Sequence, residues 1–165
     1  MMQHAMSAGQ SGMGFWLRVG GTQTLDSIPG AGDAMDRVRM VSEFLSSLSA
    51  EVVLRDYRIV HAGYDPSIPV DEHDVHKMMT VRSIFSAEKP IDESRQVIVG
   101  HTPVQNDLVP SESRDAWESE VLLDDGRPSV IAIDTGIYLK EQDTPRLTAL
   151  NLLDGRIVYQ TRVEY

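Results

Sequence analysis

The sequence predicts an α/β fold in a single domain that spans residues 1–165. Two observations lead to this prediction. Several short apolar runs are rich in valine and isoleucine and have the length of buried strands. Other segments repeat apolar residues at steps of three and four, as one face of a helix does. A chain of 165 residues with a hydrophobic fraction of 41% is long enough to bury a core.

Two segments are expected to be helices. Residues 33–49 carry apolar side chains at helical spacing, and Asp33 stands where a capping acid belongs. Residues 71–85, which follow Pro66 and Pro69, are expected to form the second helix. The expected strands are a hairpin of residues 52–54 and 57–60, a buried strand at 96–99, two strands at 121–123 and 129–133, and a closing hairpin of 147–152 and 156–163. Residues 103–120 are expected to be a loop.

Charge and composition exclude several classes of function. The net charge of −10 argues against a nucleic-acid partner, because phosphate backbones are bound by lysine and arginine. No stretch has the roughly 20 apolar residues of a membrane helix, so no membrane partner is expected. The chain has no cysteine and its first residues do not resemble a signal peptide, which fits a cytoplasmic location. A phosphorylated substrate would need local positive charge, from an arginine or from a bound divalent metal.

Three apolar runs end in the same manner, with a ligand-type side chain and a glycine. They are Ile-Val-His-Ala-Gly at 59–63, Ile-Val-Gly-His-Thr-Pro at 98–103 and Ile-Ala-Ile-Asp-Thr-Gly at 131–136. A rigid strand fixes the ligand, and the glycine lets the chain turn beside it. Imidazole and carboxylate suit Mn, Fe or Zn. A single histidine after a strand is more often a hydrogen-bonded core residue. His61 and His101 share one context, and this context together with the resemblance described next predicts a metal site.

These runs carry a family resemblance. The strings at 59–66, 97–103 and 133–136, taken in this order, resemble the C-terminal half of the phosphoprotein phosphatase family, which belongs to the calcineurin-like metallophosphoesterases. Residues 16–27 resemble the family's segment before its middle helix, and Leu-Thr-Ala-Leu at 147–150 resembles its closing strand. The resemblance implies a partial layered α/β/β/α metallophosphoesterase sandwich, with one sheet mostly intact and the other short of strands. Such a domain would leave apolar surface and sheet edges exposed.

The resemblance also implies roles for single residues. His61 and His101 match the family's ligands of one of two adjacent divalent ions, which are Mn, Fe or Zn. Arg82 matches a phosphate-binding arginine, although Thr80 stands where relatives have a tryptophan; an arginine on a solvated helix face is the alternative. Asp134 is expected to be a strand-end residue or to contact a metal ligand, rather than to bind the ion itself. Residues 137–145 depart from the family's glycine pair, so the rim of the site is expected to differ there.

Most of the family's other ligands are expected to be absent from this chain. Relatives carry Asp-x-His, Gly-Asp-x-x-Asp-Arg and Gly-Asn-His-Glu upstream of the matching segment, and Met1, Met2 and Gln3 resemble the residues that follow the last motif. Residues 32–37 match the second motif in their letters, but no apolar strand precedes them. Asp-x-His occurs at 71–73 and 74–76 in an expected helix, where residues two apart point to different faces. A solvated acidic first turn is the favoured interpretation there, and His4 has no supporting context.

These observations predict a fragment of a metal-dependent phosphoric monoester hydrolase of the serine/threonine protein phosphatase type. The intact family site would bind two divalent ions and act on a phosphorylated protein or a small phosphoester. Two imidazoles make an incomplete site, so we expect this chain to be inactive alone. Two alternatives stay open. One is a fragment of a diadenosine-tetraphosphate-type hydrolase, and the other is a non-catalytic binding or scaffold protein that pairs with a separate N-terminal half.

Overall fold

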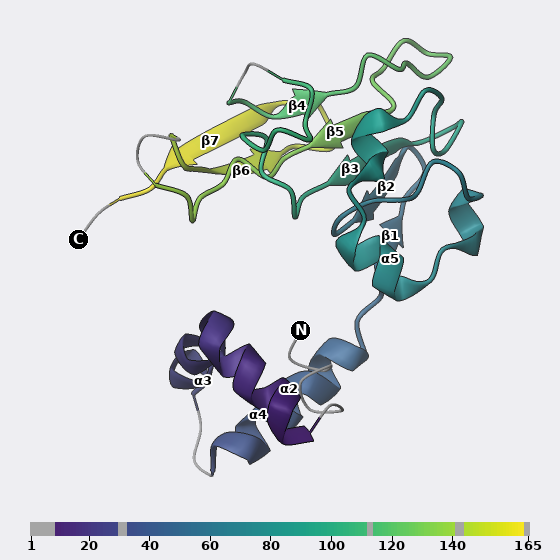
Figure 1. Cartoon of the computed structure of the whole chain (residues 1–165). Helices are drawn as coiled ribbons and strands as arrows, with labels where there is room; N and C mark the ends of the chain where they lie inside the picture. Colours follow the sequence, from purple (N-terminus) through teal and green to yellow (C-terminus); the bar gives the residue numbers. More distant parts are fainter. Residues whose placement is uncertain (1–8, 30–32, 112–113, 141–143, 164–165) are drawn as a thin grey trace. The chain divides into compact units, whose positions relative to one another are not determined.

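The computed structural model describes residues 9–29, 33–111, 114–140 and 144–163. The chain divides into two compact units, Met1–Ser49 and Ala50–Tyr165 (Figure 1). The second unit combines a mixed β-sheet with a few short helices, so the predicted α/β class is confirmed. The expectation of one domain over residues 1–165 stays a prediction. No helix in the described ranges is long and apolar enough to cross a membrane.

The first unit is helical. Helix α2 (Gly9–Trp16), the kinked turn η1 (Leu17–Gly21) and helix α3 (Thr22–Ser27) occupy a segment without a sequence-based prediction. Helix α4 (Ala34–Ser46) confirms the predicted helix, and the Asp33 side chain accepts the Asp36 N–H at 2.9 Å as its cap. Trp16 and Val38 are the buried centre of this unit.

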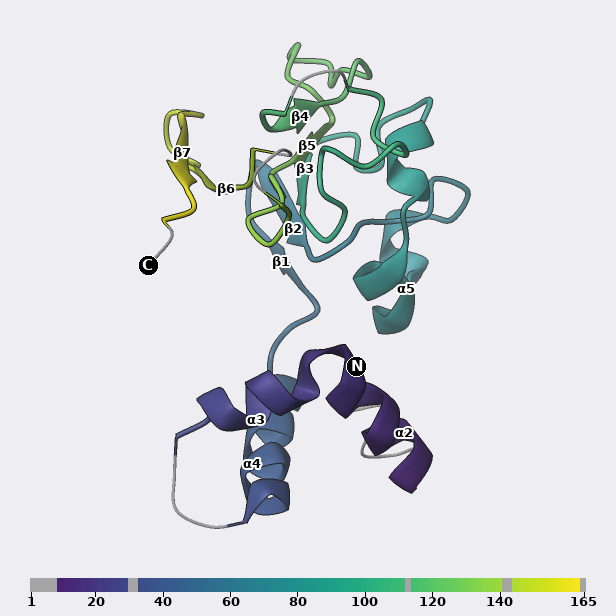
Figure 2. The same ribbon diagram turned by 60° about the vertical axis from the view of Figure 1, so that its left-hand side comes forward.

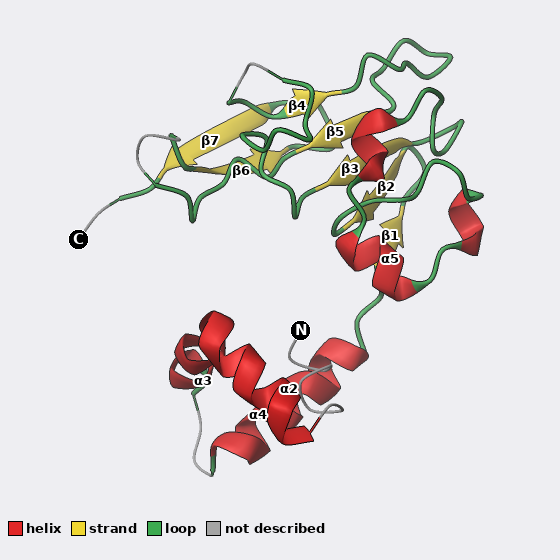
Figure 3. Ribbon diagram, viewed as in Figure 1, coloured by secondary structure: helices red, strands yellow, loops and turns green. Residues whose placement is uncertain are grey.

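A five-stranded sheet forms the framework of the second unit (Figure 3). Its spatial order is β1 (Glu51–Val53), β2 (Tyr57–Val60), β3 (Gln96–Val99), β5 (Val130–Ala132) and β4 (Trp117–Glu118). The inner strands β2, β3 and β5 run parallel, and β1 and β4 pair antiparallel at the two edges. Strand β3 is buried at every position, as expected for a parallel strand covered on both faces. The predicted strands at 52–54, 57–60, 96–99 and 129–133 are confirmed with small changes of bounds.

The structure differs from the sequence prediction between residues 103 and 123. Residues 121–123 form no regular strand; Leu122 makes only an isolated bridge with Pro128. The expected loop 103–120 contains the short strand β4. The closing hairpin is confirmed as β6 (Arg146–Leu150) and β7 (Ile157–Thr161), with Leu150 opposite Ile157. It is held to the end of β5 by the Thr135 hydroxyl, which donates to the Arg146 carbonyl at 2.7 Å.

The single helix predicted for residues 71–85 is wrong. The segment contains the 3-10 turn η2 (Val70–Glu72), helix α5 (Val75–Thr80) and a second 3-10 turn η3 (Ser83–Ser86). The break has a local cause, because the Asp74 side chain accepts the Lys77 N–H at 2.9 Å and so caps a new helix. It also has a tertiary cause, because His73 turns inward, where its Nε2 accepts the Asp65 N–H at 2.8 Å and its Nδ1 donates to the Pro69 carbonyl at 3.1 Å. His73 is buried, so a solvated turn is also the wrong interpretation at this position.

Helix α5 lies beside the sheet at the end of β2 (Figure 2). The Met78 carbonyl accepts the Ala62 N–H at 2.9 Å, which ties the helix to the residue that follows His61. Gly63 has a φ of 141° and lies against Ile84 of η3, so a Cβ there would lie 3.0 Å from the Ile84 side chain. The chain that leaves β2 therefore needs glycine at this position.

A buried arginine joins four segments of the second unit. The Arg58 side chain, 6% exposed, pairs with Glu51 at 2.9 Å, Asp71 at 3.0 Å and Asp92 at 3.1 Å. The Tyr64 hydroxyl donates to the same Glu51 carboxylate. Burial opposes the charge of Arg58, but the hydrogen bonds and the nearby carboxylate outweigh it and raise its pKa. This network fixes β1, β2 and the loops that follow them.

Candidate functional site

The three parallel strands end at one edge of the sheet, and each delivers one ligand-type side chain there. His61 follows β2, His101 follows β3 and Asp134 follows β5. Backbone hydrogen bonds hold these ends together: Gly100 N–H donates to the His61 carbonyl at 2.9 Å, and Val104 N–H donates to the Asp134 carbonyl at 2.9 Å. The sheet register therefore produces the convergence that the three similar strand ends predict.

The two histidines meet directly. His61 Nε2 lies 3.0 Å from His101 Nδ1, and the ring centroids are 4.8 Å apart with a tilt of 59°. Two imidazole nitrogens that bind one ion at about 2.0–2.1 Å, at right-angled to tetrahedral geometry, lie about 2.9–3.4 Å apart. The observed separation fits either a shared metal ion or a direct N–H···N hydrogen bond. The pair therefore fits the metal that the resemblance implies.

The backbone of His101 has an unusual conformation. Its φ is 66°, in the left-handed region that few residues other than glycine occupy. Such strain persists only where the surrounding structure holds it, and it is frequent at functional sites. Here the bonds around Gly100 and Val104 hold it from both sides, so the sheet fixes the direction of the His101 side chain.

Charge around His101 favours the neutral imidazole. Burial lowers the pKa of His101 from its ordinary value of 6.5, the neighbouring His61 and Arg82 lower it further, and Asp134 acts in the opposite direction. A neutral imidazole is the form that binds metal.

Arg82 lies between α5 and η3, outside both elements. It is exposed, and its Nη1 donates to the Thr80 carbonyl at 3.5 Å, which leaves most of the guanidinium in solvent. Arg82 therefore does not lie on a helix, as the alternative expected. It is exposed to solvent, which the alternative also expected. The positive charge of Arg82 lowers the pKa of His101.

The carboxylate of Asp134 has a local partner. Its Oδ1 accepts the Gly136 N–H at 3.0 Å, as in a turn. Within the described ranges, no three histidine, aspartate or glutamate side chains are grouped so that they could hold a metal ion. If the histidine pair holds an ion, the described residues in this arrangement supply no group of three such ligands around it.

The other motif-like residues have structural roles. Asp33 caps α4, Asp71 pairs with Arg58 and Asp74 caps α5. His76 is exposed on α5. Gly32 of the 32–37 match and His4 lie outside the described residues. One feature of the site was not predicted: the Thr102 side chain, next to His101, is fully buried, and its Oγ1 has no hydrogen-bond partner among the described residues.

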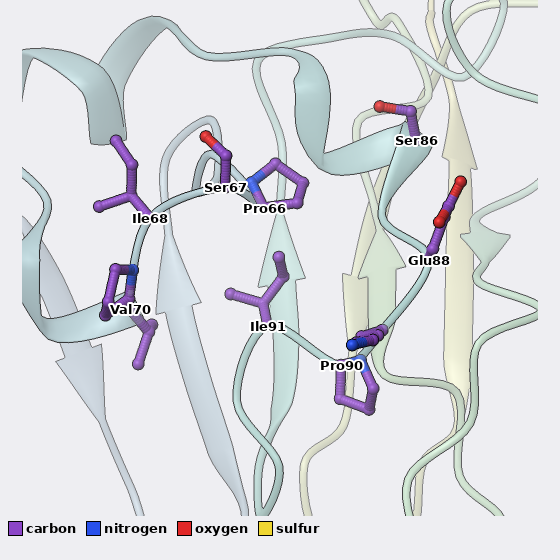
Figure 4. Close-up of a pocket in the computed structure, with 10 residues that line it drawn as sticks. Pro66, Ser67, Ile68, Val70, Ser86, Glu88, Pro90 and Ile91 are labelled. Carbon is purple, nitrogen blue, oxygen red and sulfur yellow. The ribbon is translucent and has the colours of Figure 1, made fainter.

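Two pockets lie in the second unit. The larger is a groove of about 630 Å³ between residues 66–70 and 86–91, lined largely by proline and aliphatic side chains. Figure 4 shows Ile91 between Val70 on one side and Pro90 on the other, with Ser86 and Glu88 at the rim. The smaller, about 210 Å³, is lined by Pro103, Gln105, Asn106, Tyr138 and Leu139. Its lining comes from the loop that follows His101 and from the loop that follows Asp134 in the sequence.

Comparison of the chain with protein-family models, with curated proteins and with solved structures finds no match. The candidate site therefore rests on its own residues, which are two facing imidazoles at the ends of adjacent strands.

Proposed function

We propose that this chain carries the two-histidine part of a metallophosphoesterase site, from a hydrolase of phosphoric monoesters of the serine/threonine protein phosphatase type. The observation that carries the proposal is the 3.0 Å separation of His61 Nε2 and His101 Nδ1 at the ends of adjacent parallel strands. A mixed five-stranded sheet with a separate two-stranded ribbon is also compatible with a partial α/β/β/α sandwich.

In this proposal His61 and His101 hold one divalent ion, which is Mn, Fe or Zn. When bound, such an ion polarises a phosphoryl oxygen and lowers the pKa of a bound water. In this proposal the chain's own residues hold the ion and bind the phosphate. The left-handed backbone at His101 orients the imidazole. The exposed guanidinium of Arg82 supplies the positive charge that binds the phosphate oxygens in this proposal. Local positive charge of this kind is what an acidic chain of net charge −10 needs to bind a phosphoester.

We further propose that the chain alone does not catalyse hydrolysis. Two imidazoles leave most coordination positions of an ion to water, and family members complete the site with carboxylates. A scaffold or binding role, in pairing with a separate N-terminal half, is the second candidate. It is supported by the edge strand β1 and its neighbour, where Val52, Val53 and Leu54 are 49%, 47% and 41% exposed. Exposed apolar side chains on an edge strand are a surface for pairing with another chain.

Metal titration of the full chain tests the proposal. Calorimetry with Mn²⁺ or Zn²⁺ should show one ion per chain, and His61→Ala and His101→Ala should each weaken binding at least about tenfold, since even partners of ligands cost that much. His76→Ala, an exposed histidine on α5, is the matched control and should bind as the wild type does. Hydrolysis of p-nitrophenyl phosphate should stay at background. Binding that survives both substitutions would refute the histidine pair, and two tight ions per chain would refute an incomplete site.

A further inference from the structure

Strand β1 lies at the edge of the five-stranded sheet, with β2 on one side and no described strand on the other. The register of the hairpin identifies its outward backbone groups. Leu54 N–H donates to the Tyr57 carbonyl at 2.8 Å, and Val52 lies opposite Ile59. Because bonded and unbonded positions alternate along an antiparallel pair, the N–H and C=O of Val53 point away from β2. The edge therefore presents backbone groups to which a further strand can bind.

Three consecutive apolar residues lie along this edge. Val52, Val53 and Leu54 are 49%, 47% and 41% exposed. No charged residue or proline interrupts the run, although these are the residues that commonly keep edge strands from pairing. A second strand at this edge would remove apolar surface from water, which favours association.

The sequence of the edge is complementary to itself. When a two-fold axis at Val53 relates two antiparallel β1 strands, Val52 lies opposite Leu54 of the second copy. In the same arrangement Glu51 lies opposite Arg55 of the second copy, and Val53 exchanges both of its backbone hydrogen bonds with its own counterpart. An axis at Val52 would instead place Glu51 opposite a valine. The arrangement centred at Val53 therefore matches apolar residues with apolar residues and an anion with a cation.

The charge around Glu51 favours a cation from a second copy. Glu51, Asp71 and Asp92 approach the Arg58 guanidinium at 2.9, 3.0 and 3.1 Å, and Arg95 approaches Asp92 at 3.4 Å. This cluster holds three carboxylates and two guanidinium groups, so one negative charge is left over. A further guanidinium beside Glu51 would balance it.

A second copy of the chain carries a matching cation at the facing position. The Arg55 side chain is 92% exposed and pairs with Asp56 in a surface contact, which contributes little to stability. We propose that β1 binds β1 of a second copy of this chain, antiparallel and centred at Val53, so that the two sheets continue into each other. The inference goes beyond the proposed function and does not depend on the metal site.

Sedimentation velocity of the full chain over a series of concentrations tests the dimer. We expect the wild type to dimerise reversibly as the concentration rises. Arg55→Glu puts carboxylates opposite each other at both ends of the strand pair and should weaken dimerisation at least about tenfold. Arg55→Lys is the matched control, which keeps the charge and should dimerise within about twofold of the wild type. Arg55 lies in an exposed turn, so neither substitution should change the unfolding of the dilute monomer.

Val53→Pro tests the backbone contact. It removes the N–H that points away from β2, and proline is tolerated on an edge strand at such a position. The variant should fold, which circular dichroism reports, and it should remain monomeric.

Disulfide cross-linking determines the register. The chain contains no cysteine, so an introduced thiol has no competitor. Residues that face each other at a non-hydrogen-bonded position have Cα atoms about 4.5 Å apart, within the range of a disulfide. An equimolar mixture of Val52→Cys and Leu54→Cys chains should therefore oxidise to a covalent heterodimer, whereas neither variant alone should form a covalent dimer.

The outcomes decide the inference separately from the proposed function. A wild type that remains monomeric throughout overturns it and leaves the edge to a different chain. A dimer that survives both Arg55→Glu and Val53→Pro also overturns it, because the contact then lies elsewhere. A covalent dimer of Val52→Cys alone would overturn the register centred at Val53. None of these substitutions alters His61 or His101, so metal titration still reports the proposed function by itself.

Discussion

The Nε2 atom of His61 lies 3.0 Å from the Nδ1 atom of His101, although 40 residues separate them in the sequence. Without an ion, two imidazoles can approach this closely only if one N–H donates to the lone pair of the other. Two imidazolium cations at this distance would repel each other. The neighbouring His61 therefore opposes the protonation of His101.

His61→Ala should raise the pKa of His101. In the wild type this pKa lies below 6.5, chiefly because of burial and next because of His61. Removal of His61 brings the pKa of His101 part of the way back toward 6.5, and burial keeps it below that value. The Cε1–H resonance of His101, followed against pH by NMR without metal, measures the change. An unchanged midpoint in the variant would show that the two rings are not in contact in solution.

The sign of the associated stability change follows from the same shift. The unfolded state binds the His101 proton near pH 6.5 and the folded state only at lower pH. The free energy of unfolding should therefore fall as the pH falls below 6.5, by at most about 1.4 kcal/mol per pH unit for this group. Chemical denaturation of wild type and His101→Gln at pH 7 and pH 5 should show a smaller loss in the variant.

Arg58→Ala should destabilise the second unit by about 3–5 kcal/mol, since it leaves the buried Asp92 carboxylate without its main cation. Urea denaturation measures the loss. Arg55→Ala is the matched control, because Arg55 pairs only with its neighbour Asp56 at the surface and its loss should leave the midpoint unchanged. Equal effects of the two substitutions would remove the central role assigned to Arg58.

The sequence predicted the sheet better than the segment between its strands. The runs at 57–60 and 96–99 each end in apolar, β-branched residues and follow turn residues, so local pattern alone identifies them. Residues 71–85 also show a local pattern, but the outcome depends on His73, which bonds to Asp65 outside the segment. A contact of that kind leaves no periodic signal in the sequence.

Some functional residues could likewise be predicted from local sequence, and others could not. His61 and His101 were predictable because each follows a strand that carries its own signal, and parallel neighbours end at one edge. Arg58 was not singled out, because nothing near it in the sequence shows that Asp71 and Asp92 converge on it. The pocket beside Tyr138 was also missed, since it exists only where two turns some thirty residues apart meet.

Gly63→Ala should destabilise the fold by about 2–5 kcal/mol, the sum of about 1–2 kcal/mol for an unfavourable positive φ and about 1–3 kcal/mol for overpacking against Ile84. Gly126→Ala is the control for φ alone: its φ is 85°, and no atom lies within 4 Å of the added Cβ. It should cost about 1–2 kcal/mol. Thermal unfolding of both variants measures the difference, and equal losses would mean that Ile84 moves aside without cost.

Alkaline pH should destabilise the protein through Tyr64. Burial raises the pKa of the Tyr64 hydroxyl, and its hydrogen bond to the Glu51 carboxylate raises it further. The unfolded chain loses this proton near pH 10 and the folded chain only at higher pH, so the free energy of unfolding falls as the pH rises above 10. The slope for one group is at most about 1.4 kcal/mol per pH unit.

Denaturation at pH 9 and pH 11 should show this loss in the wild type and a smaller loss in Tyr64→Phe. Glu51→Gln should fall in between, because burial still opposes ionisation. Parallel losses in all three proteins would assign the alkaline transition to other groups.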